Sequence, residues 1–540
     1  MTTPSSNTSD IDGIRSLLVR LLEEGKDAEV VALVLSILRQ LKDDNDRLQV
    51  RLAKLLHERF GRRSEKIPIG QLRLFLEEAL AQGEGQEDQQ AADIELPSPV
   101  PKLKTKRSKK PTGRRALSAD LPREEIVLEP AAEEKVCAVC GSAKTCIGHE
   151  RSEVLEFVPA SFKVLVYARA KYACRPCEGQ LVIAPTGARP IEGGLPGFGL
   201  LSDVLVKKYA EHAPLHRIRE MYRRLGVDLP VSTLAHWVAV AAETLGPIAR
   251  AIQRETLASH VVQADDTGLL VLDRSKDGGS KRGHIWGYVG DRTWTSYAYT
   301  PTWEAAGPCA FLAERVGWLQ ADAYRGFDRL FKGPGATAVE VGCFAHARRY
   351  FVKALETDRR AAVALHHIGQ LYGVEREATE AGVDATARLV LRRVKSKPAV
   401  EALGRWIADT MPAAPPKSPL GAALTYIVNQ WEALERFLED GRLELDNNGC
   451  ERALRTIAVG RKNWLFAGSD QGAERAAVIY TVFGTCRLHG IDPWGYVRDV
   501  FEKLAAGWRQ NRIAELLPPT WARLHAPAVV AQADDVAISA

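Results

Sequence analysis

The order of β-like and helix-like segments from residue 259 onward constrains the fold of this chain more than any other feature. Three runs rich in β-branched and aromatic residues come first, at 260–272, 283–290 and 293–299. Gly290-Asp291-Arg292 forms a turn signal between the last two runs, so the three runs predict a meander. Helix and strand patterns then alternate, at 304–315, 317–322, 325–332 and 338–342. This order predicts an α/β domain built on one sheet.

Three carboxylates in this part of the chain are candidate metal ligands. Asp265 lies in the first strand, Asp322 closes the short strand at 317–322, and Glu451 opens a helix. Two strand-borne aspartates and one helix-borne glutamate can converge on a pair of magnesium ions, the arrangement that cleaves and rejoins phosphodiesters. Strand alternation puts Asp265 and Asp266 on opposite faces, so at most one of the two points at the metals. Periodicity alone does not say which one.

The sequence around these carboxylates is more specific than the carboxylates themselves, because the chain has 68 acidic residues. Five motifs follow in order: Gln-Ala-Asp-Asp-Thr (263–267), Asp-Ala-Tyr-Arg-Gly-Phe (322–327), Gly-Cys-Phe-Ala-His-Ala-Arg-Arg-Tyr-Phe (342–351), Asp-Asn-Asn-Gly-Cys-Glu-Arg-Ala-Leu-Arg (446–455) and Arg-Lys-Asn-Trp-Leu-Phe-Ala-Gly-Ser (461–469). Together they resemble the transposases of the insertion sequence 66 family, a branch of the DDE superfamily. The resemblance covers nearly the whole chain.

The resemblance implies a fold and a chemistry. It implies an RNase H-like domain at 255–480, in which the first and fourth strands lie side by side and bring Asp265 and Asp322 together. It selects Asp265, Asp322 and Glu451 as catalytic residues that hold two Mg²⁺ (or Mn²⁺) ions. The implied activity is cleavage and strand transfer of DNA, with no covalent protein–DNA intermediate.

Two positions depart from the family pattern. Asp266 stands where the family pattern has Glu, and no arginine follows the third strand near Trp303. Neither change removes an expected metal ligand. The second removes one expected DNA contact and leaves open an element whose activity has decayed.

Four cysteines predict a zinc site. Cys137 and Cys140, with Cys174 and Cys177, form two Cys-x-x-Cys knuckles that can bind one structural Zn²⁺ tetrahedrally. The β-like run at 162–167 between them favours a zinc ribbon at 126–190. Cys146 and His149 offer a rival site with the first knuckle, and the resemblance favours the four cysteines.

The N-terminal region, 10–66, carries a heptad pattern. Val34, Leu41, Leu48 and Leu55 recur every seven residues, and Asn45 occupies one position of the interleaved seam. A buried asparagine at such a position favours a parallel two-stranded coiled coil. We therefore expect a homodimer or higher oligomer, against the alternative of an amphipathic helix packed on its own domain.

A linker at 67–125 follows the heptads. Residues 77–95 hold seven acids and no bases, and residues 102–115 hold eight bases and no acids. The basic run, with Lys106, Arg107, Lys109 and Lys110, is either a solvated tether or a contact to the DNA backbone, and we favour the contact.

Further DNA contacts are expected in ordered parts. The region 195–250 reads as helices, with a basic helix at 214–225 and a second helix that begins after Ser232 as its N-cap. This is a helix-turn-helix pattern, weak alone, with Thr233 and His236 on its second helix. The remaining candidates for phosphate contact are His346, Arg348, Arg349, Arg452, Arg461 and Lys462.

Residues 350–440 are mostly helical in pattern and predict a helical insertion in the catalytic domain, and 481–525 predicts a C-terminal helical element. Arg392, Arg393, Lys395 and Lys397 favour a contact between this insertion and DNA. The expected fold class is thus multidomain α+β: coiled coil, zinc ribbon, helix-turn-helix-like helices and RNase H-like domain.

Composition limits the alternatives. The chain has 540 residues, a net charge of +5 and no long apolar run, so we expect several domains, no membrane span and a cytoplasmic, nucleoid-associated protein. The expected partners are double-stranded DNA, both element terminal inverted repeats and target, and accessory proteins of the same element. The competing functions are a DNA-binding regulator with an inactive catalytic domain and a coiled-coil assembly protein.

Overall fold

The computed structural model describes residues 160–172, 182–276, 279–333 and 335–525, with scattered positions between 19 and 76. Contacts within the chain divide it into two compact units, residues 1–85 with 169–540 and residues 86–168. The basic run at 102–115, the cysteines Cys137, Cys140, Cys146, Cys174 and Cys177, and His149 lie outside the described residues. So does most of the heptad segment, of which Val31, Val34 and Leu48 are described and exposed.

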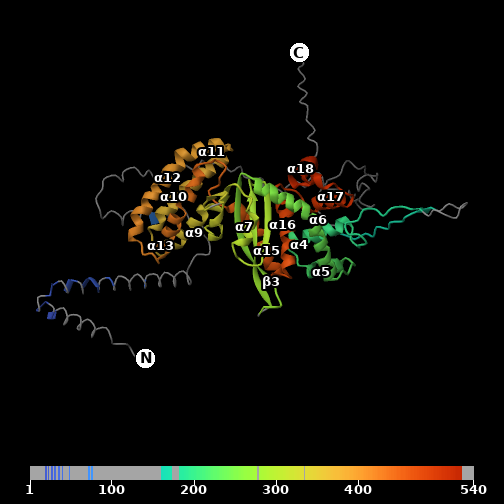
Figure 1. Ribbon diagram of the computed structural model, residues 1–540, viewed down its shortest axis with the longest axis horizontal. Coiled ribbons are helices and arrows are strands. Elements are labelled where there is room, and N and C mark those ends of the chain that lie inside the picture. The colour runs from blue at the N-terminus through green and yellow to red at the C-terminus, as the bar shows by residue number, and fades with distance from the viewer. Residues whose placement is uncertain are drawn as a thin grey trace, which may run out of the picture. The chain divides into compact units, whose positions relative to one another are not determined.

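A mixed sheet forms the centre of the larger unit (Figure 1). Its strands are β3 (Val261–Leu272), β4 (Ser280–Gly290), β5 (Trp294–Thr300), β6 (Gly317–Gln320), β7 (Ala338–Val341) and β8 (Phe466–Ala467). The order is β5-β4-β3-β6-β7, with β8 beside the far end of β3. β3, β4 and β5 form the predicted antiparallel meander, and β6 and β7 run parallel to β3. The first and fourth strands therefore lie side by side, as expected.

Helices α4 (Phe198–Tyr209), α5 (Leu215–Arg224) and α6 (Val231–Ala258) precede the sheet. The expected cap at Ser232 is wrong, because α6 begins at Val231 after Pro230 and no side chain caps it. α6 also runs past residue 250, the expected end of this region, and its Thr256 hydroxyl bonds that of Ser296 on β5 at 2.7 Å.

Short helices follow β5 and cover one face of the sheet. They are α7 (Ala306–Phe311), η2 (Arg325–Phe327) and α8 (Asp328–Phe331). Phe327 and Leu330 pack there against Trp286 and Tyr288 of β4 in one buried cluster.

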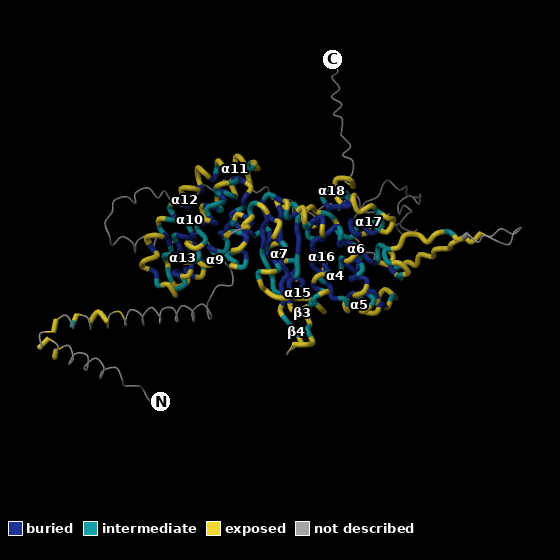
Figure 2. Tube along the Cα trace, viewed as in Figure 1, coloured by how far each residue is buried: buried dark blue, intermediate teal, exposed yellow. Residues whose placement is uncertain are grey.

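The segment after β7 is helical, as predicted. It contains α9 (Phe344–Leu355), α10 (Ala361–Glu380), α11 (Ala385–Leu391), the π-helical η3 (Arg392–Ser396), α12 (Lys397–Thr410), η4 (Met411–Ala413), α13 (Pro419–Asn429), α14 (Trp431–Glu435) and η5 (Arg436–Leu438). These helices share one buried core, which also includes Val261 of β3 and Val341 of β7 (Figure 2). Arg392 is fully buried and its guanidinium pairs with Glu375 at 2.6 Å, so the expected DNA contact by Arg392 is wrong.

The last helices are α15 (Asn448–Trp464), α16 (Asp470–Leu488), α17 (Pro493–Ala505), η6 (Gln510–Leu516) and α18 (Pro518–His525). α16 covers the edge strand β5: the hydroxyls of Thr481 and Thr485 accept the backbone N–H groups of Tyr297 and Thr295 at 3.0 and 3.2 Å. The otherwise open edge is thereby satisfied. None of the helices described here combines the length and apolarity that crossing a membrane requires.

Near the zinc knuckles, the β-like run at 162–167 forms no strand. A two-stranded ladder instead pairs β1 (Lys171–Tyr172) with β2 (Val182–Ile183).

Candidate active site

Asp265 lies in the middle of β3, on the face that α15 covers. It stands opposite Gly287 of β4 in the ladder. A Cβ at Gly287 would lie 3.0 Å from the Leu454 side chain, so glycine favours this close approach of α15 to the sheet. The Cys450 thiol donates to the Gly287 carbonyl at 3.1 Å. This contact brings the neighbouring residue, Glu451, to the side of the sheet that bears Asp265.

Asp322 follows the parallel strand β6. The parallel ladder pairs Gln263 of β3 with Gln320 of β6. Asp265 and Asp322 each lie two residues after this pair, at the same level of the sheet. The regular strand ends at Gln320, two residues earlier than predicted. Beyond it, the Asp322 carbonyl accepts the backbone N–H of Tyr324 at 2.8 Å.

Two buried glutamines tie the segments of the site together, and sequence reasoning missed both. The Gln263 amide donates to Gln320 Oε1 at 3.1 Å and to the Asp446 carbonyl at 3.0 Å, and its oxygen accepts the Cys450 N–H at 3.1 Å. The Gln320 amide donates to the carbonyls of Gly342 and Glu444 at 3.1 and 2.8 Å. The signal was present: the triplet Gln-Ala-Asp occurs at 263–265 and again at 320–322.

The carboxylates influence one another. Burial raises the pKa of Asp265 to about 7, and repulsion from Asp322 and Glu451 adds to the shift. Burial also raises the pKa of Asp322; His346 opposes this change, while Asp266 and Glu451 reinforce it. The site thus concentrates negative charge away from water and would be stabilised by cations.

Glu451 is engaged by α9 in this structure. Arg349 Nη2 donates to both Glu451 oxygens, at 3.0 and 2.9 Å, and His346 Nε2 lies 3.9 Å from Glu451 Oε1. Arg349 also contacts His346 at 3.0 Å. Two of the predicted phosphate contacts therefore lie at the candidate active site.

Asp266 points to the other face, as alternation requires. Its Oδ2 lies 2.6 Å from His284 Nδ1, and its Oδ1 accepts the indole N–H of Trp303 at 3.1 Å. The Trp303 carbonyl in turn accepts the Tyr324 hydroxyl at 2.6 Å. These bonds hold Asp266 apart from the α15 side of the sheet.

The donor set fits a hard divalent cation in its chemistry. Asp265, Asp322 and Glu451 offer carboxylate oxygens, the ligands that Mg²⁺ takes in proteins. Burial and, to a smaller extent, neighbouring carboxylates raise the pKa values of Asp265 and Asp322. In this conformation, no three acidic, histidine or cysteine side chains among the described residues are grouped closely enough to hold an ion. Glu451 is instead paired with Arg349 at 2.9 Å.

The other predicted DNA contacts are spread over α6, α9 and α15. His236 in the first turns of α6 is exposed, and so are Arg452 and Lys462 on α15, while Thr233 and Arg348 are half-buried. Arg461 is half-buried and donates to the Gly268 carbonyl.

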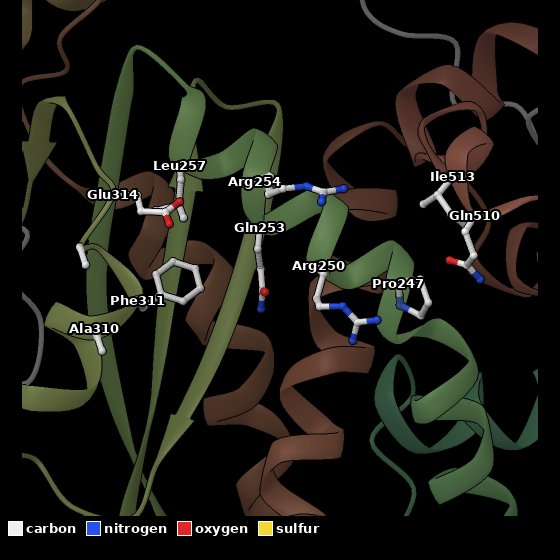
Figure 3. Close-up of a pocket in the computed structure, with 11 residues that line it drawn as sticks. Pro247, Arg250, Gln253, Arg254, Leu257, Ala310, Phe311, Glu314, Gln510 and Ile513 are labelled. Atoms are coloured by element: carbon white, nitrogen blue, oxygen red, sulfur yellow. The ribbon is translucent and has the colours of Figure 1, made fainter.

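A cleft of about 530 Å³ lies elsewhere, between α6, α7 and η6 (Figure 3). Arg250 and Arg254 of α6 line it with Phe311 and Gln510. None of the three carboxylates lines this cleft.

Comparison with known proteins places the chain in a family. Residues 193–475 match the model of the transposase IS66 family. Residues 134–178 match the zinc-finger binding domain of transposase IS66, 481–518 match the IS66 C-terminal element, and 47–126 match a model described as transposase C of IS166 homeodomain.

Relatives of similar length occur in Sinorhizobium fredii. The protein y4hP is 34% identical over 513 residues, which cover 89% of this chain and 90% of the relative. The protein y4qI is 32% identical over 540 aligned positions, which cover 94% and 96%. With the match to residues 193–475, about half of the sequence, these findings show that the chain belongs to the IS66 transposase family.

Proposed function

We propose that this protein is an active insertion-sequence transposase, which binds the element's terminal inverted repeats and catalyses strand cleavage and strand transfer. One observation carries the proposal. Asp265, Asp322 and Glu451 come from β3, the segment just after β6 and α15, and they lie close enough that repulsion from Asp322 and Glu451 raises the pKa of Asp265, and repulsion from Glu451 raises that of Asp322.

The sheet supports an RNase H-like catalytic domain at 255–480. Its order, β5-β4-β3-β6-β7, has an antiparallel meander on one side of β3 and parallel strands on the other. The helices of 350–440 are the proposed insertion, and 481–525 is the proposed C-terminal element.

The chain's residues divide the catalytic work. Asp265, Asp322 and Glu451 would hold two Mg²⁺ (or Mn²⁺) ions, which activate the attacking hydroxyl and stabilise the leaving oxygen when bound. Gln263 and Gln320 hold the two aspartate-bearing strands at a fixed offset. Arg349 and His346, which contact Glu451 here, would contact a phosphate at the same place when Glu451 binds metal.

Other parts of the chain would bind DNA and a second copy of the protein. We propose base readout by the α5–α6 pair through Thr233 and His236, and backbone contacts by Arg348, Arg452, Arg461, Lys462 and the run at 102–115. Cys137, Cys140, Cys174 and Cys177 would bind one Zn²⁺, in the segment that matches the zinc-finger model. A parallel coiled coil would form the dimer, and the exposure of Val31, Val34 and Leu48 in the single chain supports this. Action at the nucleoid, with accessory proteins of the element, completes the proposal.

The test is nicking of a supercoiled plasmid that carries the inverted repeats flanking this gene. We expect full-length protein to nick at the repeat ends with Mg²⁺ and not with EDTA. Specific binding without nicking would instead identify a DNA-binding regulator. If the protein neither binds nor nicks this DNA, the result would identify an assembly protein.

A further inference from the structure

The β3–β4 hairpin extends beyond the main sheet. β6 pairs only with residues 261–263 of β3, whereas β4 pairs with β3 as far as Leu272. Near its far end, Leu270 pairs with Phe466 of β8, which directly follows α15. β3, which carries Asp265, and α15, which carries Glu451, therefore both extend to this end of the hairpin. Leu270 lies five residues along β3 from Asp265, roughly 17 Å at the rise of a strand.

This part of the hairpin exposes apolar side chains on one face. Leu270 is 49% exposed, Leu272 41% and Phe466 45%. Strand alternation puts Leu270 and Leu272 on the face of Asp266, and parallel pairing puts Phe466 beside Leu270. Figure 2 shows the exposed end of the hairpin.

Trp303 extends the row along the same face toward Asp266, whose Oδ1 accepts the indole N–H. It is 55% exposed, and its ring stacks on His284 with centroids 5.9 Å apart. His284 stands opposite Gly268, one same-face position before Leu270. We call Trp303, Leu270, Leu272 and Phe466 the hairpin face.

The backbone beside this face is strained. Leu465 has a φ of +60° and is 61% exposed. A branched, non-glycine residue rarely adopts this conformation, and such strain gathers at functional positions. Leu465 lies between the end of α15 and the start of β8, so its conformation determines the position of the Phe466 ring.

Several cations lie at the far end of the hairpin face. Arg282 stands opposite Leu270 in the ladder and its side chain covers Gly268. Arg461 donates to the Gly268 carbonyl, and Lys462 is exposed nearby on α15. The acids Asp273 and Asp470 both pair with Lys281, at 3.8 and 2.6 Å. Among the described residues, no acidic side chain pairs with Arg282.

We infer that the hairpin face receives unpaired nucleotides at a DNA end, with bases on Phe466 and Trp303 and phosphates on Arg282 and Lys462. This inference rests on the proposed function. Aromatic and apolar platforms beside a cationic track are the signature of single-strand binding, because every base has a face to stack. A second copy of the chain is a poorer occupant, since symmetric pairing would bring the same cations together.

The experiment compares two labelled DNA duplexes of one length, one fully paired and one with non-complementary bases at one end. Binding of full-length protein is followed by fluorescence anisotropy. We expect the wild type to favour the frayed end. Leu270→Ala with Phe466→Ala should reduce affinity for the frayed end by about fivefold or more, and leave the paired duplex unchanged. Phe466→Trp should retain the preference.

Leu488→Ala, at an equally exposed leucine on α16, is the matched control and should change neither affinity. An equal loss on both DNAs, or no loss on either, overturns the inference while the proposed function stands. Dissociation of an oligomer by the double variant would reassign the face to self-association and also overturn it. A wild type that binds neither DNA refutes the proposed function itself.

Discussion

The buried side chain of Gln263 on β3 donates a hydrogen bond to that of Gln320 on the parallel strand β6, with 3.1 Å between Nε2 and Oε1. Each glutamine stands two residues before a candidate catalytic aspartate. The bond joins side chains 57 positions apart in the chain. It fixes Asp265 and Asp322 at one level of the sheet. Through Cys450 and Asp446, Gln263 also fixes the start of the helix that carries Glu451.

Gln263→Ala should therefore both destabilise the protein and slow cleavage. It leaves the Cys450 N–H and the Asp446 carbonyl without this partner, at a cost of about 2–4 kcal/mol in the free energy of unfolding. Urea denaturation and the plasmid nicking assay measure the two effects. Gln370→Ala, at an exposed glutamine of α10, should change stability by less than about 0.5 kcal/mol. Equal stability of the two variants would contradict the role of Gln263.

Removal of one negative charge from the site should abolish cleavage. We expect Asp265→Asn, Asp322→Asn and Glu451→Gln each to abolish nicking while DNA binding persists, because each loses a charged ligand of a metal ion. Asp266→Asn should be milder, since Asp266 bonds to His284 and Trp303. The exposed Asp409→Asn on α12 is the control. Loss of nicking in the Asp266 variant with retention in the Asp265 variant would reverse the assignment.

The stability of the metal-free protein should depend on pH through Asp265. Its pKa is raised from 3.8 to about 7, so between these values the folded state binds more protons than the unfolded state. Stability is then greatest below the lower value and falls as pH rises through about 7. Without divalent ions, Asp265→Asn should melt at a higher temperature than wild type at about pH 8 and equally at about pH 4. Added Mg²⁺ should raise the wild-type melting temperature at the higher pH and leave the variant unchanged. A pH-independent difference would refute the shift.

Local patterns predicted the elements of the sheet well. Runs rich in β-branched and aromatic residues predicted β3, β4 and β5, and the adjacency of β3 and β6 followed from the family resemblance. The helix of Glu451 was also expected, and α15 has Glu451 in its first turn. The strands and the helix depend on short local segments, and the strand order is implied by the family resemblance, so both can be predicted from one sequence.

Features that depend on distant partners were missed. Arg392 looked like part of a basic surface, yet its guanidinium turns inward to Glu375 and to the carbonyls of Phe437 and Leu443. Nothing local distinguishes this buried arginine from its exposed neighbours. α12 has Pro398 in its first turn, where proline is tolerated because no intrahelical N–H bond is lost. Ser232 looked like a cap, but the fixed φ of Pro230 lets the helix begin two residues earlier, at Val231.

We predict one zinc ion per chain at Cys137, Cys140, Cys174 and Cys177. Cys174→Ser should lose the zinc and lower the melting temperature of its segment, because thiolate ligation stabilises the folded form. Cys146→Ser should keep it. Metal analysis of both purified variants gives the stoichiometry. Zinc retained by the first and lost by the second would move the site to Cys146 and His149.

The last prediction concerns how the basic run and the α5–α6 helices share DNA binding. A run of eight bases without acids offers charge and no fixed geometry, so it can follow phosphates and cannot read base edges. Replacement of Lys106, Arg107, Lys109 and Lys110 by alanine should weaken binding to repeat DNA and random DNA by similar factors. The slope of log affinity against log salt should become shallower by up to about four units, one for each lost phosphate contact.

Substitutions on α6 should act differently from changes in the basic run. His236 is exposed and Thr233 half-buried in the first turns of α6, where a reading helix meets base edges. His236→Ala should narrow the affinity gap between repeat DNA and random DNA and leave the salt slope unchanged. Titrations of both DNAs at several salt concentrations separate the two effects, with Arg498→Ala, whose guanidinium pairs with Glu502 at 2.9 Å, as a charge-loss control. An unchanged slope in the four-alanine variant would reduce the basic run to a solvated tether, and an unchanged gap in the His236 variant would move base readout to the zinc-binding segment.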